Sequence, residues 1–139
     1  MGDRLKQCRL IDIPRFADER GSLSAIQFGS PIPFDPKRFF YIYGVSAGAD
    51  RGSHALKFSE EFIIPMVGSF SICIDDGDSK IEYRLDRPDR GLYIPPLIWH
   101  VLSDFSPKSV CGVLASTPFD PAGYYRIYQE FLNAVGMVR

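Results

Sequence analysis

Cysteine and histidine, two residue types that often build protein sites, are scarce in this sequence of 139 residues. The three cysteines, Cys8, Cys73 and Cys111, stand far apart and form no CxxC pair. This argues against a zinc ribbon and a disulfide framework, and it fits a reducing cytoplasm. The only histidines are His54 and His100, so any chemistry that requires imidazole depends on these two positions.

Long apolar runs and clusters of basic residues are also missing. The most apolar stretch, residues 62–74, is broken by Pro65 and Gly68 and is too short to span a bilayer. Residues 1–9 mix charges without an apolar run, so they do not form a signal peptide. A net charge of −1 argues against nucleic acid or an anionic membrane as a partner. We therefore expect one cytoplasmic domain over residues 1–139.

Short β-prone segments fill most of the chain. The densest in aromatic and β-branched residues is 38–45, and Asp76-Gly77 predicts a tight hairpin between two others. The remaining strands are expected at residues 10–13, 22–28, 51–57, 62–67, 69–75, 81–85, 92–94, 99–103 and 110–116. Nine or ten short strands with regular turns predict an all-β sandwich or barrel.

The C-terminal segment has a different periodicity. Asp120 can cap a helix that has Pro121 at its first position, and Gly136 is a plausible end. Apolar residues then recur at helical spacing, at Tyr124, Ile127, Tyr128, Phe131, Leu132 and Val135. We expect one short α-helix over about residues 121–135.

Both histidines stand in a recognisable two-part pattern. His54 lies in a β-prone segment and is followed by Glu61 and Gly68, whereas His100 comes after the hairpin and after Pro95-Pro96. This order is typical of a cupin-type jelly roll, a double-stranded β-helix. We expect His54, Glu61 and His100 to share its interior.

Those three residues allow two kinds of chemistry. Two histidines and one carboxylate could hold a metal ion. However, alternate residues of a strand share a face, and Leu56 occupies the position where a second ligand of a His-x-His pair would stand. The same residues could instead move a proton on a carbon beside a carbonyl. Tyr41, Tyr43, Arg51 or His100 could then stabilise the enolate.

Arginines in or beside the β-segments point to an anionic ligand. Arg20, Arg38 and Arg51 fall at such positions in a nearly neutral protein. The planar guanidinium group suits phosphate, although scattered surface charge is an equally good interpretation of any one of them.

The order and spacing of the motifs resemble a known family, the dTDP-4-keto-6-deoxyglucose 3,4-ketoisomerases, which are WxcM-like cupins of bacterial deoxysugar pathways. The resemblance covers nearly the whole chain. Its residues are Arg38-Phe39-Phe40-Tyr41-Ile42, Arg51-Gly52-Ser53-His54-Ala55-Leu56-Lys57, Gly68-Ser69-Phe70, Asp75-Asp76-Gly77, Gly91-Leu92-Tyr93-Ile94, Trp99-His100, Asp104-Phe105-Ser106, Val113-Leu114-Ala115-Ser116 and Tyr124-Tyr125-Arg126.

The resemblance implies a jelly-roll homodimer with exchanged N-terminal strands, a dTDP-sugar ligand, and neither metal nor cofactor. It implies a reaction that moves a keto group from C4 to C3 of the hexose through an enediol, in O-antigen or S-layer glycan biosynthesis. His54, Arg51 and Tyr41 match active-site residues of the family. Arg20 stands in a turn similar to that of the related 3,5-epimerases, where such an arginine helps to hold the nucleotide.

Two residues depart from the family pattern. Leu56 replaces the second active-site histidine, and Glu61 replaces a glutamine. Glu61 could serve as the base, with its pKa raised by the apolar barrel; His54 could act alone; or the chain could bind the sugar without isomerising it.

From these alternatives the sequence-based prediction is an isomerase. Its proton-transfer pair is His54 and Glu61, and Tyr41 and His100 support the enediol. The substrate contacts are Arg20, Arg38 and Arg51. A non-catalytic nucleotide-sugar-binding cupin is the alternative, and a metal-dependent cupin enzyme is a third.

Overall fold

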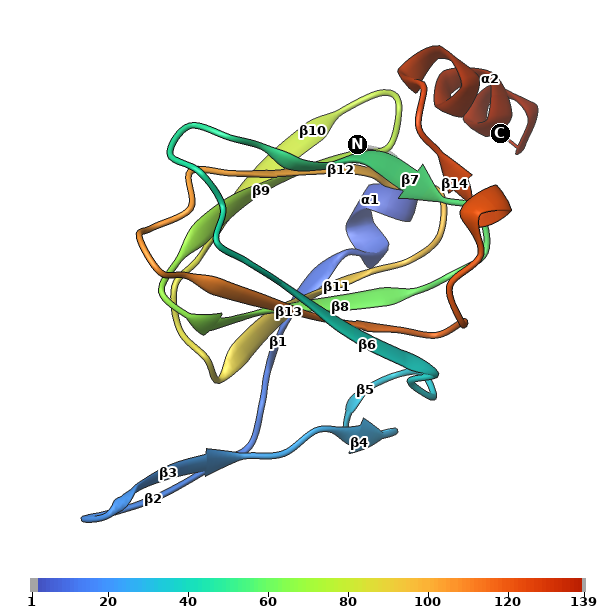
Figure 1. Ribbon diagram of the computed structural model, residues 1–139. Coiled ribbons are helices and arrows are strands. Elements are labelled where there is room, and N and C mark those ends of the chain that lie inside the picture. Colours follow the sequence, from blue (N-terminus) through green and yellow to red (C-terminus); the bar gives the residue numbers. More distant parts are fainter. Residues whose placement is uncertain (1–2, 139) are drawn as a thin grey trace.

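The computed structural model describes residues 3–138 and places two antiparallel five-stranded sheets face to face (Figure 1). One sheet has the order β1-β11-β8-β13-β6 and the other β10-β9-β12-β7-β14. Their strands are β1 Arg9–Asp12, β6 Arg38–Tyr43, β7 Arg51–Leu56, β8 Glu61–Val67, β9 Phe70–Asp75, β10 Lys80–Leu85, β11 Arg90–Ile94, β12 Trp99–Ser103, β13 Val110–Ala115 and β14 Tyr124–Tyr125. This arrangement confirms the prediction of a jelly roll.

Alternation of apolar residues explains why the sheets face each other. In β9 the side chains of Phe70, Ile72 and Ile74 are fully buried and belong to the main core. In β10 the apolar residues Ile81 and Tyr83 pack against the same core, while the charged residues between them are exposed. Burying one face of each strand supplies the main stabilisation of the sandwich.

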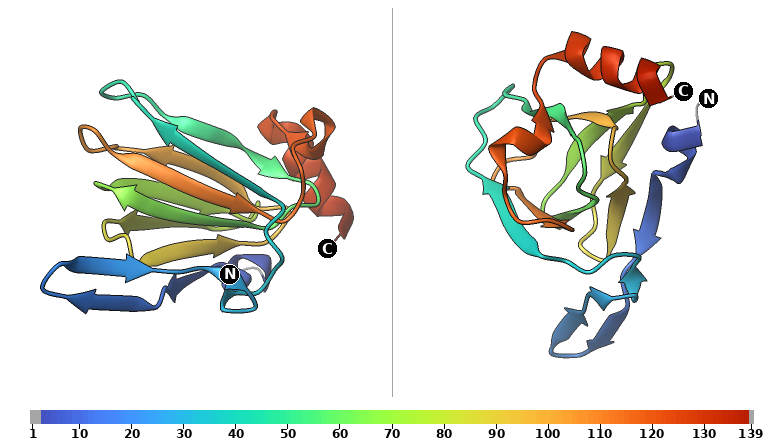
Figure 2. Two further views of the ribbon diagram at one scale, coloured as in Figure 1. Left: turned by 60° about the horizontal axis from the view of Figure 1, so that its bottom comes forward. Right: turned by 90° about the vertical axis from the view of Figure 1, so that its right-hand side faces the viewer.

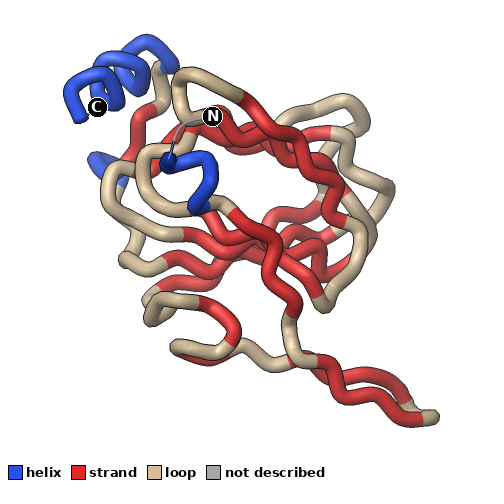
Figure 3. Tube along the Cα trace, turned by 180° about the vertical axis from the view of Figure 1, so that it is seen from behind, coloured by secondary structure: helices blue, strands red, loops and turns tan. Residues whose placement is uncertain are grey.

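Four short elements lie outside the two sheets. The hairpin of β2 Arg15–Asp18 and β3 Gly21–Ser24 extends away from the sandwich, as Figures 1 and 3 show. It leads into the short pair β4 Gln27–Phe28 and β5 Pro31–Ile32. Arg20 is therefore placed in the turn of a projecting hairpin.

Two α-helices complete the fold of residues 3–138. Helix α1, Asp3–Gln7, was not anticipated, and its Leu5 enters the main core. Helix α2, Tyr128–Val138, lies outside the sandwich (Figure 2) and buries Phe131 and Val135 against Ala55 of β7. No helix within residues 3–138 is long and apolar enough to cross a membrane.

The predicted bounds of the C-terminal helix were wrong. Asp120 does act as a cap, because its carboxylate accepts a hydrogen bond from the Ala122 amide at 3.0 Å, but it caps the short 3₁₀ helix Pro121–Gly123. The chain then pairs with β7 as strand β14 before α2 begins at Tyr128, and α2 continues through Gly136. Pairing with the edge of β7 outweighs the helical pattern of the intervening residues.

Candidate active site

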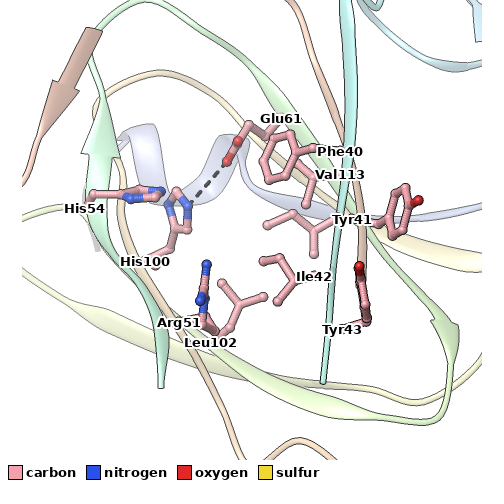
Figure 4. A pocket seen from close by; sticks show the side chains of 12 residues that line it. Phe40, Tyr41, Ile42, Tyr43, Arg51, His54, Glu61, His100, Leu102 and Val113 are labelled. Atoms are coloured by element: carbon pink, nitrogen blue, oxygen red, sulfur yellow. Dashed lines mark ion pairs between the residues drawn. The ribbon is translucent and has the colours of Figure 1, made fainter. Parts of the chain in front are cut away.

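A cavity of about 280 Å³ lies between the two sheets and contains both histidines (Figure 4). Its apolar wall comes from Phe40, Ile42, Ile63, Leu102 and Val113, and its polar groups come from Arg51, His54, Glu61 and His100. The structure thus brings together five of the seven site residues that the sequence predicted, because Tyr41 of β6 also lines the cavity. The apolar wall was not predicted residue by residue, although alternation along β6 would have identified Phe40 and Ile42.

Two positive backbone φ angles in β7 bring Arg51 to the cavity. Against β12, His54 pairs with His100 and Gly52 with Val101, so Ser53 is an extra residue in a β-bulge. Gly52 has a φ of +88° and Ser53 a φ of +60°. Because a bulge shifts the alternation of side chains, Arg51 and His54 both line the cavity although three positions separate them.

Glu61 and His100 form a buried contact between the sheets. Glu61 Oε1 lies 3.3 Å from His100 Nε2, and the two side chains are only 4% and 2% exposed. The other ring nitrogen of His100, Nδ1, lies 3.1 Å from the carbonyl oxygen of Ile98. Figure 4 shows the carboxylate and the imidazole pointing toward each other at the wall of the cavity.

His54 lies beside this pair, and its surroundings lower its pKa. Its ring meets the ring of His100 edge-on, with centroids 4.9 Å apart, and that of Tyr124 at 5.1 Å. Burial lowers the pKa of His54 to about 3, and the positive charges of His100, Arg126 and Arg38 act in the same direction. His54 is therefore a neutral imidazole at physiological pH.

Cys111 is the only described cysteine close enough to Glu61 to sense its charge. Burial raises the pKa of the Cys111 thiol to about 12, and the charge of Glu61 adds to the effect. The residue is a neutral thiol of the core, so it supplies no nucleophile.

Tyr41 lines the cavity, but its ring points away from the interior, so the support of the enediol by its hydroxyl group stays a prediction. Figure 4 shows the rings of Tyr41 and Tyr43 on the side of β6 opposite to the cavity. The cause is the alternation of the strand, which turns Phe40 and Ile42 inward and leaves Tyr41 56% exposed. The inward-facing side chains of this part of β6, Phe40 and Ile42, carry no hydrogen-bond donor.

Arg38 and Leu56 line a second cavity of about 340 Å³, near the 3₁₀ helix Pro121–Gly123 and β14. The Arg38 guanidinium stacks between the rings of Phe40 and Phe119 and donates from Nη2 to the Tyr124 hydroxyl at 3.1 Å. Its buried Nε makes no hydrogen bond within the part of the chain that the structure describes. Arg38 therefore acts on the first cavity only through its charge.

The metal-binding interpretation has no support from the placement of side chains. Among residues 3–138, no group of three or more histidine, cysteine or acidic side chains is arranged to hold a metal ion. Glu61 and His100 contact each other directly, and His54 presents its ring rather than completing a ligand set.

Comparisons with known proteins agree on one family. The model of the FdtA family, described as WxcM-like, C-terminal, matches residues 6–136. The TDP-4-oxo-6-deoxy-alpha-D-glucose-3,4-oxoisomerase of Aneurinibacillus thermoaerophilus is 38% identical over 130 residues, which cover 94% of each chain.

Solved structures extend this similarity to the fold. The sugar 3,4-ketoisomerase QdtA from Thermoanaerobacterium thermosaccharolyticum, in complex with TDP, has a TM-score of 0.93 and 34% identity over 96% of this chain and 98% of its own. The TDP-quinovose 3,4-ketoisomerase WlaRB from Campylobacter jejuni has a TM-score of 0.88 and 39% identity over 92% of this chain and 98% of its own. With the family model matching nearly the whole sequence, this chain belongs to the FdtA family of WxcM-like proteins.

Proposed function

We propose that this chain is an isomerase of a dTDP-linked 4-keto-6-deoxyhexose, and that it moves the keto group from C4 to C3 through an enediol. The observation that carries the proposal is the buried contact between Glu61 and His100 in the wall of an otherwise apolar cavity. A carboxylate held away from water can remove a proton from the carbon beside a carbonyl. The family relatives named as 3,4-ketoisomerases support this reaction type.

The cavity and its charges suit the proposed substrate. A volume of about 280 Å³ lies just below the usual range for small-molecule sites, so it suits the hexose, with the nucleotide outside. Arg51 is exposed at the cavity, and its side chain makes no hydrogen bond or ion pair within residues 3–138. Its guanidinium is the proposed contact of the diphosphate. A solved relative binds TDP, and another form of that enzyme binds TDP-4-keto-6-deoxyglucose.

Glu61 is the proposed base and His54 a neutral hydrogen-bonding neighbour of the sugar. His54 was predicted as half of the proton-transfer pair, but an imidazole with a pKa of about 3 is a weak base. The alternative of a sugar-binding protein without activity rests on Leu56 alone. Because Glu61 and His100 can supply proton transfer without a histidine at position 56, we favour the enzyme.

A homodimer with exchanged N-terminal strands belongs to the same proposal. The projecting hairpin exposes Phe16 and Leu23, 65% and 60% exposed, and the outer face of β6 carries the exposed rings of Phe39, Tyr41 and Tyr43. A second copy of the chain would cover such a surface. Arg20, in the turn of this hairpin, would then contact nucleotide in the partner's site rather than in its own.

The dimer has its own test in light scattering. The wild-type protein should have twice the chain mass at micromolar concentration, and Phe16→Glu should shift it toward the monomer. Phe58→Glu alters a residue that is 74% exposed near the second cavity and should leave the dimer intact. A monomeric wild-type protein would contradict the dimer.

A cytoplasmic location is part of the proposal, since all three cysteines are free thiols, as expected in a reducing compartment.

The reaction is tested by proton NMR of the protein with dTDP-4-keto-6-deoxyglucose in D₂O. We expect the C3 proton signal to disappear and a 3-keto product to form. Loss of the signal without a product would indicate a partial, epimerase-like reaction. Broadening of the thymidine signals without exchange would support the non-catalytic alternative.

A further inference from the structure

The hydrogen bonding of His100 determines where its protons can be. A backbone carbonyl only accepts hydrogen bonds, so Nδ1 of His100, 3.1 Å from the Ile98 oxygen, must carry a hydrogen. The second nitrogen, Nε2, faces Glu61 Oε1 at 3.3 Å. The charge and the hydrogen bonding of the pair therefore depend on whether a proton lies between these two atoms.

A contact without a proton would be costly. A neutral His100 protonated on Nδ1 and an ionised Glu61 would turn two lone pairs toward each other in a site where both side chains are almost inaccessible to water. Each buried group left without a hydrogen-bond partner would destabilise that arrangement. A single proton between them turns this repulsion into a charge-assisted hydrogen bond.

Within residues 3–138, Glu61 is the only acidic side chain that lines the cavity, and cations surround it. Arg51 lines the same cavity, and the charges of Arg38 and Arg126 reach it, as their effect on His54 indicates. Because these cations attract a carboxylate but repel a protonated imidazole, the shared proton is inferred from the geometry of the buried contact and not from the surrounding charges. Cys111 is a neutral thiol and His54 a neutral imidazole, so neither adds a charge.

We propose that Glu61 and His100 form one proton-transfer unit with a single shared proton, which takes the place of a histidine at position 56. The inference rests on the proposed function. Glu61 acts as the base, and the protonated His100 remains beside it as a fixed positive charge.

The steps balance without any co-reactant. Glu61 takes the C3 proton; the C3–H electron pair forms the C3=C4 double bond, and the carbonyl electrons move to O4. The O3 hydroxyl proton passes to the neighbouring O4. An electron pair from O3 then re-forms the carbonyl at C3, while the C3=C4 pair forms the new C4–H bond with the proton that Glu61 returns. The Glu61–His100 unit goes from neutral to positive while the substrate becomes an enediolate, so the two charges attract each other in a site of low dielectric.

The free protein provides a test that does not require activity. The chain has only two histidines, so ¹⁵N-histidine labelling gives two ring systems, which His54→Asn assigns. At neutral pH we expect both nitrogens of His100 to be protonated in the wild-type protein. In Glu61→Gln, the amide can donate to Nε2, so His100 should keep a proton on Nδ1 alone. A wild-type His100 without a proton on Nε2, or one that Glu61→Gln leaves unchanged, would overturn the shared proton.

The rate of isomerisation provides a second test of the shared proton. Glu61→Gln and His100→Gln should each lower the rate of isomerisation by about 10²–10⁴-fold. Glu60→Gln is the matched control, because the adjacent Glu60 accepts a hydrogen bond from Tyr93, at 2.5 Å, and does not line the cavity. A wild-type rate in His100→Gln would overturn the inference even if Glu61→Gln failed to fold. Absence of turnover by the wild-type protein would refute the proposed function instead, while the shared proton would still be judged by the histidine spectra.

Discussion

Glu61 of β8 and His100 of β12 belong to opposite sheets of the sandwich, and their side chains meet with 3.3 Å between Oε1 and Nε2. The contact crosses the interior, so it forms only when both sheets are in place. This explains how a chain with two histidines can hold a paired acid and base. It also places that pair in the wall of the cavity that the β7 bulge opens to Arg51.

Lower pH should destabilise the fold through His54. Its pKa is about 3 in the folded chain against an ordinary value of 6.5, so the unfolded chain binds more protons between these values. The stabilisation is complete above pH 6.5 and is lost as pH falls, by at most about 1.4 kcal/mol per pH unit and by less because the ring is partly exposed. Urea midpoints between pH 7 and 4.5 should therefore fall more steeply for the wild-type protein than for His54→Asn. Equal slopes would mean that His54 is not buried as a neutral ring.

Gly52 should tolerate substitution less well than another glycine of similar conformation. A Cβ at Gly52 would lie 3.0 Å from the carbonyl oxygen of His100, whereas the space around Gly48 is open. Both residues have positive φ angles, +88° and +79°, so both alanine variants bear backbone strain of about 1 kcal/mol. We expect Gly52→Ala to lower the free energy of unfolding by about 1–2 kcal/mol more than Gly48→Ala in denaturant titrations. Equal losses would show that the bulge can shift away from β12.

Arg51→Gln should weaken substrate binding more than catalysis. A charged hydrogen bond to phosphate contributes about 1.5–3 kcal/mol, so we expect KM to rise about 10–100-fold with kcat little changed. Arg87→Gln is the control, since Arg87 pairs with Asp89 rather than lining the cavity. A fall in kcat at unchanged KM would remove Arg51 from the role of diphosphate contact.

The hydroxyl of Tyr128 should hold α2 against the sandwich. It donates to the buried carboxylate of Asp75 at 2.6 Å, and Tyr128→Phe leaves one oxygen of Asp75 without this donor. We expect a loss of about 1–3 kcal/mol in the free energy of unfolding. Tyr125→Phe, whose hydroxyl makes no hydrogen bond within residues 3–138, should change it by less than about 0.5 kcal/mol.

The sequence predicted those parts of the structure that depend on local patterns. Alternation along β9 and β10 identified the core faces, and the spacing of His54, Glu61 and His100 placed them in one cavity. These features could be predicted because the side-chain period of a strand is fixed by its geometry.

The features that the sequence did not predict depend on contacts between distant segments. Strand β14 pairs with the edge of β7, which delays α2 to Tyr128. The direct contact between Glu61 and His100 requires both sheets, and nothing within either strand signals it. The outward direction of the Tyr41 ring is a different case, because alternation within β6 already separates it from the inward-facing Phe40.

The role of Glu61 as the base is tested most directly by the rate of isomerisation of dTDP-4-keto-6-deoxyglucose. This rate should be compared among the wild-type protein, Glu60→Gln and Glu61→Gln. The change in Glu61→Gln removes the base but keeps the size of the side chain, whereas Glu60→Gln makes the same change outside the cavity. We predict that Glu61→Gln loses about 10²–10⁴-fold in rate and that Glu60→Gln stays within about threefold of the wild-type protein. Full activity in Glu61→Gln would contradict the assignment of the base and leave the missing histidine at position 56 without a replacement.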